Sequence, residues 1–273
     1  MTVNFIDITC SGTVHATDSL IIKRTKEGIE TSELSGKPKY VQIPKFNGFM
    51  SWFGTAKFAE WYVMDYLQSK AAEAAKIDIG QIQDFSDQIA QEVGEKLNGG
   101  GLPNLQERGC GIHFTFYEEI DGLWIPELMF ITNYSGYDFT GYKTNAKVLQ
   151  ARRQTFHTIS GNTDDNYEKH QEPKYRKSVF SFLNSVRSLP YTNGDNFFTN
   201  RGYTNAEEML PLFAARKSLK TLDVLEAAQR KALFAVKFAS LSHEMFNTAP
   251  TVGGECFSAA VSPVEGYTSE IKS

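Results

Sequence analysis

The chain begins with short hydrophobic runs separated by polar turns, a pattern typical of paired strands. Four such runs predict two strand pairs, 3–8 with 13–15 and 39–43 with 48–53. Turn residues lie inside each pair, a Ser-Gly in the first and a proline followed by Asn-Gly in the second. Between the pairs, the polar stretch 23–37 predicts an irregular or edge hairpin.

Beyond residue 56 the hydrophobic positions recur at helical spacing. Residues 56–75 predict a first helix, because apolar positions three and four apart are followed by good helix formers. Residues 84–97 predict a second helix with one apolar face. We expect Asp84 or Ser86 to be its N-cap.

Alternation of apolar and polar residues returns in the middle of the chain. The segment 112–125 predicts a hairpin that turns at Asp121-Gly122. The runs 128–132 and 154–159 predict a further strand pair.

The last part of the chain mixes irregular and helical patterns. Residues 162–221 show little period and are interpreted as an insertion, with one short helix near 179–186. The amphipathic stripe over 222–246 predicts a long helix, and 256–262 predicts a closing strand. The order strands, two helices, strands, one or two helices, strand predicts a single α+β domain over 1–273, with its helices segregated from antiparallel sheets.

Composition narrows the function classes. With 41% hydrophobic, 13% aromatic and 22% charged residues, the chain has the make-up of a folded globular protein. A net charge of −4 lacks the basic excess of a nucleic-acid binder, and the apolar runs are too short for a membrane span or a signal peptide. Three cysteines without a Cys-x-x-Cys spacing, and five histidines without an i,i+4 pair, predict neither a disulfide framework nor a metal site. We therefore expect a cytoplasmic protein without metal or cofactor.

Candidate chemistry is concentrated near the N-terminus. If Met1 is removed, Thr2 offers both a hydroxyl nucleophile and a free α-amine, whose ordinary pKa of about 7.7–8.0 lets it accept the hydroxyl proton. A lysine such as Lys39 beside that amine would favour its neutral form by like-charge repulsion, and Asp18 would hold the lysine in place. Backbone N–H groups at the turn 53–56 would stabilise an oxyanion. These groups suffice for amide hydrolysis.

The order and spacing of these features resemble proteasome β subunits and the bacterial proteasome-like peptidases, which are N-terminal nucleophile hydrolases. The similarity covers about 2–97 well and 154–161 with 222–267 loosely. The segments that resemble family motifs are the start MTVNFIDITCSGTVHATDSLIIK, Lys39–Ile43, Phe53-Gly54-Thr55-Ala56, Phe156–Gly161 and Thr251–Gly254. The resemblance implies a four-layer αββα sandwich of two antiparallel sheets flanked by helices, and assembly into a homo-oligomeric ring.

The resemblance also implies roles for individual residues. Thr2 would be nucleophile and base, Asp18 and Lys39 the charge network, and Ser160 a hydrogen-bond partner of the terminal amine. The N–H of Phe53 or Gly54 would be the oxyanion donor. Phe53 departs from the glycine usual at its position, and Ala249 stands where many members carry an aspartate.

Two functions from different classes remain open at this point. The first is a threonine-type hydrolase that cleaves peptide or other amide bonds after removal of Met1, with a small non-peptide amide as a further substrate class. The second is a catalytically inactive structural or binding subunit of the same fold.

Overall fold

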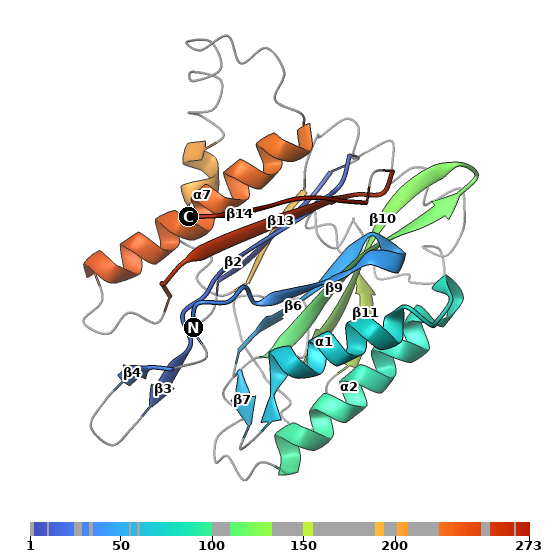
Figure 1. Cartoon of the computed structure of the whole chain (residues 1–273), viewed down its shortest axis with the longest axis horizontal. Helices are drawn as coiled ribbons and strands as arrows, with labels where there is room; N and C mark the ends of the chain where they lie inside the picture. The colour runs from blue at the N-terminus through green and yellow to red at the C-terminus, as the bar shows by residue number, and fades with distance from the viewer. Residues whose placement is uncertain are drawn as a thin grey trace. The chain divides into compact units, whose positions relative to one another are not determined.

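The computed structural model describes residues 3–9, 11–24, 29–32, 35–54, 56–58, 61–99, 110–132, 150–154, 189–193, 201–206, 224–246, 252–264 and 266–273. The chain divides into two compact units (Figure 1). The first comprises Met1–Lys39 with Lys177–Ser273, and the second comprises Tyr40–Arg176.

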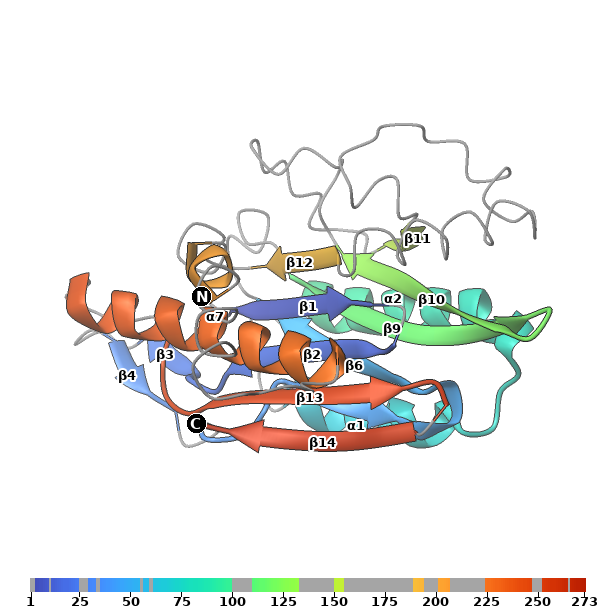
Figure 2. The same cartoon turned by 90° about the horizontal axis from the view of Figure 1, so that it is seen from above.

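The first unit is built on a five-stranded antiparallel sheet of order β12-β1-β2-β13-β14, whose strands lie side by side in Figure 2. Its strands are β1 (Asn4–Ile8), β2 (Thr13–Asp18), β12 (Leu189–Asn193), β13 (Cys256–Ser262) and β14 (Gly266–Lys272). The predicted strands at 3–8, 13–15 and 256–262 are confirmed, whereas β14 was missed. A small hairpin, β3 (Ile22–Arg24) with β4 (Ile29–Thr31), confirms the hairpin expected within 23–37.

One long helix, α7 (Val224–Phe246), packs against β1, β2 and β13. Its small and aliphatic residues meet the sheet in an apolar core that includes Phe5, Val14, Ala232 and Val236. The predicted helix over 222–246 is confirmed. Alanines at the contact allow the helix to approach the strands closely.

Part of the segment 162–221 belongs to this unit. Strand β12 pairs with β1 in register, from Asn4 opposite Asn193 to Ile8 opposite Leu189. The helical residues 201–206 include Tyr203, whose ring stacks on Phe5 at 5.0 Å. The predicted helix at 179–186 lies outside the described residues. The segment thus supplies an edge strand and a core aromatic side chain.

The second unit is built on another five-stranded antiparallel sheet, of order β11-β10-β9-β6-β5. Its strands are β5 (Tyr40–Ile43), β6 (Gly48–Phe53), β9 (Gly111–Ile120), β10 (Leu123–Thr132) and β11 (Gln150–Gln154). The two residues that turn β9 into β10, Asp121 (φ 52°) and Gly122 (φ 77°), both have the positive φ that a tight hairpin needs. The predicted strand pair within 39–53 and the hairpin at 112–125 are confirmed.

Two helices, α1 (Val63–Ala74) and α2 (Ile82–Gly99), lie side by side and cover this sheet (Figure 1). Leu67, Ile89 and Val93 of the helices enter one core with Trp52 and Phe114 of the strands. Two short 3₁₀ turns, η1 (Pro44–Phe46) and η2 (Ile79–Gln81), complete the unit.

Three predicted boundaries are wrong. The first helix begins at Val63, because Trp61–Tyr62 (β8) pairs with Lys57–Phe58 (β7) in a small hairpin that suits aromatic residues. Neither Asp84 nor Ser86 is an N-cap, since α2 begins earlier, directly after η2, where Asp78 and Gln81 form a capping box.

The third boundary concerns the strand beside the end of β10. It is β11, and its register places Gln154 opposite Leu128 and Gln150 opposite Thr132. The strand therefore lies mostly before the predicted 154–159, and 155–159 lies outside the described residues. The predicted α+β class, two antiparallel sheets with helices, is confirmed.

Candidate functional site

Two charged residues that the sequence singled out come together inside the first unit. Asp18 is the last residue of β2, and Lys39 lies 21 positions later, just before β5. The backbone N–H of Lys39 donates to the Thr17 hydroxyl at 3.2 Å, which anchors Lys39 beside the end of β2. The end of β2 and this hydrogen bond together fix the backbone position from which the Lys39 side chain extends.

The two side chains form a buried ion pair. Lys39 Nζ lies 2.9 Å from Asp18 Oδ1, and the side chains are 4% and 0% exposed. Lys39 Nζ also donates to the carbonyl of Leu20 at 2.9 Å. Because removing two charges from water is costly, such a pair is stable only when further hydrogen bonds complement both partners.

Asp18 receives those further bonds from the backbone. The N–H of Val3 donates to Oδ1 at 2.9 Å, and the N–H of Gly253 donates to Oδ2 at 3.2 Å. One carboxylate thus joins the start of β1, the end of β2 and the segment that leads into β13. Lys39, whose ammonium group is bonded to the same carboxylate, adds a fourth segment of the chain.

Of the remaining candidate residues, three lie outside the described part of the chain and two lie in the second unit. Thr2, Ser160 and Ala249 lie outside the described residues. Phe53 and Gly54 lie at the end of β6 in the second unit, and the φ of Gly54, 103°, favours glycine. Their role as oxyanion donors stays a prediction.

The Phe53 side chain has a packing role that explains a phenylalanine here. Its ring stacks on His113 at 5.1 Å and on Phe130 at 5.8 Å, and it is 3% exposed. Burial lowers the pKa of His113 to about 3, so this histidine is neutral at physiological pH. The three rings form part of the interior of the second unit.

The described cysteines are unsuited to nucleophilic chemistry. Burial raises the pKa of Cys110 to about 12. Burial, and next the charge of Asp18, raises the pKa of Cys256 to about 11. Since the thiolate is the reactive form, both thiols are inert near neutral pH.

No three histidine, cysteine, aspartate or glutamate side chains gather as a metal site would require in the part of the chain that the structure describes. Among the described helices, none has an apolar stretch of the length that a membrane crossing needs.

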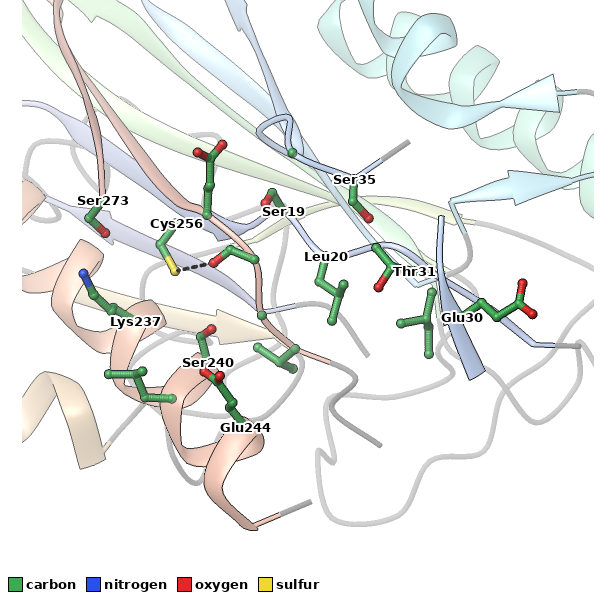
Figure 3. Close-up of a pocket in the computed structure, with 17 residues that line it drawn as sticks. Ser19, Leu20, Glu30, Thr31, Ser35, Lys237, Ser240, Glu244, Cys256 and Ser273 are labelled. Atoms are coloured by element: carbon green, nitrogen blue, oxygen red, sulfur yellow. Dashed lines mark hydrogen bonds between the residues drawn. The ribbon is translucent and has the colours of Figure 1, made fainter. Parts of the chain in front are cut away.

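A pocket of about 960 Å³ opens beside the ion pair, within the first unit (Figure 3). Its walls come from the residues after β2, the β3–β4 hairpin, the C-terminal half of α7 and the segment 252–256. Leu20 and Gly253 line the pocket and also hydrogen-bond the two residues of the ion pair. The Leu20 N–H donates to the Gly253 carbonyl at 2.9 Å, while the Leu20 carbonyl accepts from Lys39 and the Gly253 N–H donates to Asp18. The pocket wall and the ion pair are therefore built on the same backbone.

One polar group in the pocket wall is unsatisfied. The Ser19 hydroxyl is fully buried and has no hydrogen-bond partner among the described residues. A buried hydroxyl without a partner costs about 1–3 kcal/mol. Gly254, with φ of 76°, packs closely beside it, because a Cβ at this position would lie 2.8 Å from Ser19 Oγ. The sequence analysis missed this pocket, since its walls are far apart in the chain.

Comparison with known proteins gives weak similarities. No protein-family model matches the chain, and no curated protein sequence matches it. Among solved structures, the chain is similar to Anbu (ancestral beta-subunit) from Yersinia bercovieri, with 12% identity and a TM-score of 0.48 over 98% of this chain and 86% of that one. It is also similar to an Anbu (Gly-1) mutant from Hyphomicrobium sp. strain MC1, with 12% identity and a TM-score of 0.46 over 100% and 88% of the two chains. At these values the similarities assign neither a family nor a function.

Proposed function

We propose that this chain is a threonine-type N-terminal nucleophile hydrolase that cleaves peptide or other amide bonds once Met1 is removed. The observation that supports the proposal is the buried Asp18–Lys39 pair bonded to the N–H of Val3. Thr2 precedes Val3 in the sequence, and a trans peptide bond joins consecutive Cα atoms at about 3.8 Å. The ion pair is therefore bonded to Val3, the residue that directly follows Thr2 in the sequence.

In this mechanism the Thr2 hydroxyl attacks the substrate carbonyl and transfers its proton to the α-amine of the same residue. The amine returns the proton to the leaving nitrogen as the amide bond breaks, which leaves an acyl-enzyme. Water then attacks the ester, with the amine again as base. Lys39 would hold the amine in its neutral form, Asp18 would position Lys39, and Ser160 would hydrogen-bond the amine. The N–H of Phe53 or Gly54 would donate to the oxyanion.

A second candidate is a non-catalytic structural or binding subunit. It is favoured by the number of chain segments that Asp18 joins, because Val3, Gly253 and Lys39 are all bonded to it. In this alternative the pair serves only to hold the first unit together.

The two candidates differ in what the N-terminus does. We expect mass spectrometry of the protein from its native host to show that Met1 is absent, and Thr2→Ala to lower kcat/KM for peptide hydrolysis by about 10³-fold or more. Thr2→Ser keeps a hydroxyl and an amine, so it should retain part of the activity, and circular dichroism should show that all variants are folded. A retained Met1, or an unchanged rate in Thr2→Ala, would leave the non-catalytic subunit.

Assembly is a separate part of the proposal. The family resemblance implies a homo-oligomeric ring, in which the sites would face an enclosed space. Light scattering of the purified protein tests this directly, and a monomer at micromolar concentration would contradict it.

A further inference from the structure

We infer that the pocket beside Asp18 and Lys39 is a substrate subsite that takes a lysine or arginine side chain. The inference rests on the proposed hydrolase for the statement that the occupant is a substrate. It depends on the pocket's own charges, apolar walls and unsatisfied hydroxyl for the kind of side chain that fits.

The described pocket wall carries both paired and unpaired charged side chains. Glu255 is paired with Lys272, and its charge is largely neutralised. Glu30 on β4 and Glu244 on α7 are exposed and have no ion-pair partner among the described residues. Lys237 is the opposing cation in the wall. The free charge of the described lining is therefore negative.

The position of the charges favours a long cationic side chain. Lys237 and Glu244 are seven residues apart on α7, which separates their backbones by about 10 Å along the helix. Figure 3 shows Lys237 near Cys256 and Ser273, whereas Glu244 lies further along the helix. Glu30 lies on the β3–β4 hairpin, at another side of the pocket from Glu244 (Figure 3). Among the described lining residues, the two unpaired carboxylates therefore stand at two separate places, each away from Lys237.

Apolar side chains lie along the same pocket. Leu20, Leu241 and Val252 contribute to its walls. Lysine and arginine bury an aliphatic stem along apolar surface and keep a charged group at the end, so their stems suit these walls and their cationic group suits either Glu30 or Glu244. A glutamate side chain would meet a like charge at either place.

Ser19 is the second observation that indicates a ligand. Its buried, unpartnered hydroxyl lies in the pocket wall, next to the residue that carries half of the ion pair. A backbone N–H or carbonyl of a bound peptide would satisfy it. A peptide would thus be held through its backbone at Ser19 and through its side chain at one of the two carboxylates.

Binding to the Thr2→Ala variant of the full chain tests the inference without any need for hydrolysis. The probes are fluorescein-labelled hexapeptides of alanine with one central arginine, lysine, norleucine or glutamate, measured by fluorescence anisotropy. We expect the arginine and lysine peptides to bind at least about threefold more tightly than norleucine, because exposed ion pairs contribute that much. The preference should fall when salt is raised from about 0.05 to 0.5 M.

Variants of the lining assign the preference to its source. Glu30→Gln and Glu244→Gln should each weaken the cationic peptides by up to about fivefold and leave norleucine unchanged. Glu226→Gln is the matched control, because Glu226 lies on the same helix but pairs with Arg230 outside the pocket, and it should change nothing. Ser19→Ala should weaken all four peptides alike, by about fivefold.

The outcomes separate this inference from the proposed hydrolase. Tight binding of the glutamate peptide, or cationic binding that Glu30→Gln and Glu244→Gln leave intact, overturns the subsite. If wild-type protein does not cleave the peptides yet Thr2→Ala shows the predicted preference, the hydrolase proposal fails and the pocket assignment stands. If wild-type protein cleaves the peptides without a preference for arginine in kcat/KM, the subsite inference fails and the hydrolase proposal stands.

Discussion

Replacing Asp18 with asparagine tests whether the buried ion pair holds the first unit together. The change keeps the side-chain shape but removes the negative charge, while Lys39 stays 4% exposed. It also places an NH₂ group among three donors, the Lys39 ammonium and the N–H groups of Val3 and Gly253. An uncompensated buried ammonium costs about 3–5 kcal/mol. At about 2–4 °C for each kcal/mol, the melting temperature should fall by about 6–20 °C.

The assay is a double-mutant cycle followed by urea unfolding and thermal melting. Lys39→Met alone leaves the carboxylate with its two backbone donors, so it should cost less than Asp18→Asn. The double variant removes both charges and should be less destabilised than the sum of the single variants, with a coupling free energy of about 1.5–3 kcal/mol. Glu226→Gln breaks an exposed i,i+4 pair in the same unit and should cost no more than about 0.5 kcal/mol.

A cost of less than about 1 kcal/mol for Asp18→Asn, or additivity of the two substitutions within about 0.5 kcal/mol, would refute a stabilising ion pair. Either result would mean that water or another group replaces the lost partner. The stabilising role of the pair would then be small, whatever its role in catalysis.

Other buried features give further tests. Because the His113 pKa falls from 6.5 to about 3 on folding, the unfolded chain takes up a proton first as the pH falls. Stability should therefore decrease by up to about 1.4 kcal/mol per pH unit between about pH 6 and 4, and His113→Phe should flatten that slope in urea titrations. Gly48→Ala should prevent stable folding, since its Cβ would lie 1.9 Å from a backbone carbonyl. Gly36→Ala places its Cβ in open space and should cost only about 1 kcal/mol, because the φ of Gly36 is 91°. Thermal melting of the two variants measures both effects. In a Cys10→Ser background, iodoacetamide should label Cys110 and Cys256 only after unfolding, as mass spectrometry would show.

Local pattern was a good guide wherever a few neighbouring residues decide the structure. Asp121-Gly122 identified the β9–β10 hairpin because both residues adopt positive φ. The alanine-rich stripe of α7 identified the helix because its period follows one buried face. The predicted start of the first helix was wrong because Tyr62, which falls at helical spacing with Tyr66, also suits a strand. Its pairing with Lys57 in the β7–β8 hairpin decided between the two structures.

Within the candidate site, too, some features could be predicted from local sequence and others could not. Asp18 and Lys39 could be singled out because each stands at a strand boundary at a spacing that matched a known pattern. The pocket could not, because Lys237 and Glu244 look like ordinary solvent-facing residues of an amphipathic helix until Ser19, Leu20 and the β3–β4 hairpin line the same cavity. Only the contact between distant segments shows that these charges line a cavity.

Sharing of backbone between the ion pair and the pocket links stability to binding. Leu20 bonds Lys39 through its carbonyl and Gly253 through its N–H, and Gly253 in turn bonds Asp18. A ligand that fills the pocket contacts both backbone segments, so it should stabilise the folded state and the position of the ion pair together. Conversely, a substitution that loosens the pair moves the wall that holds Ser19. A structural pair and a catalytic pair are therefore not exclusive, because the bonds that hold this unit together are the same bonds that would position Lys39 for chemistry.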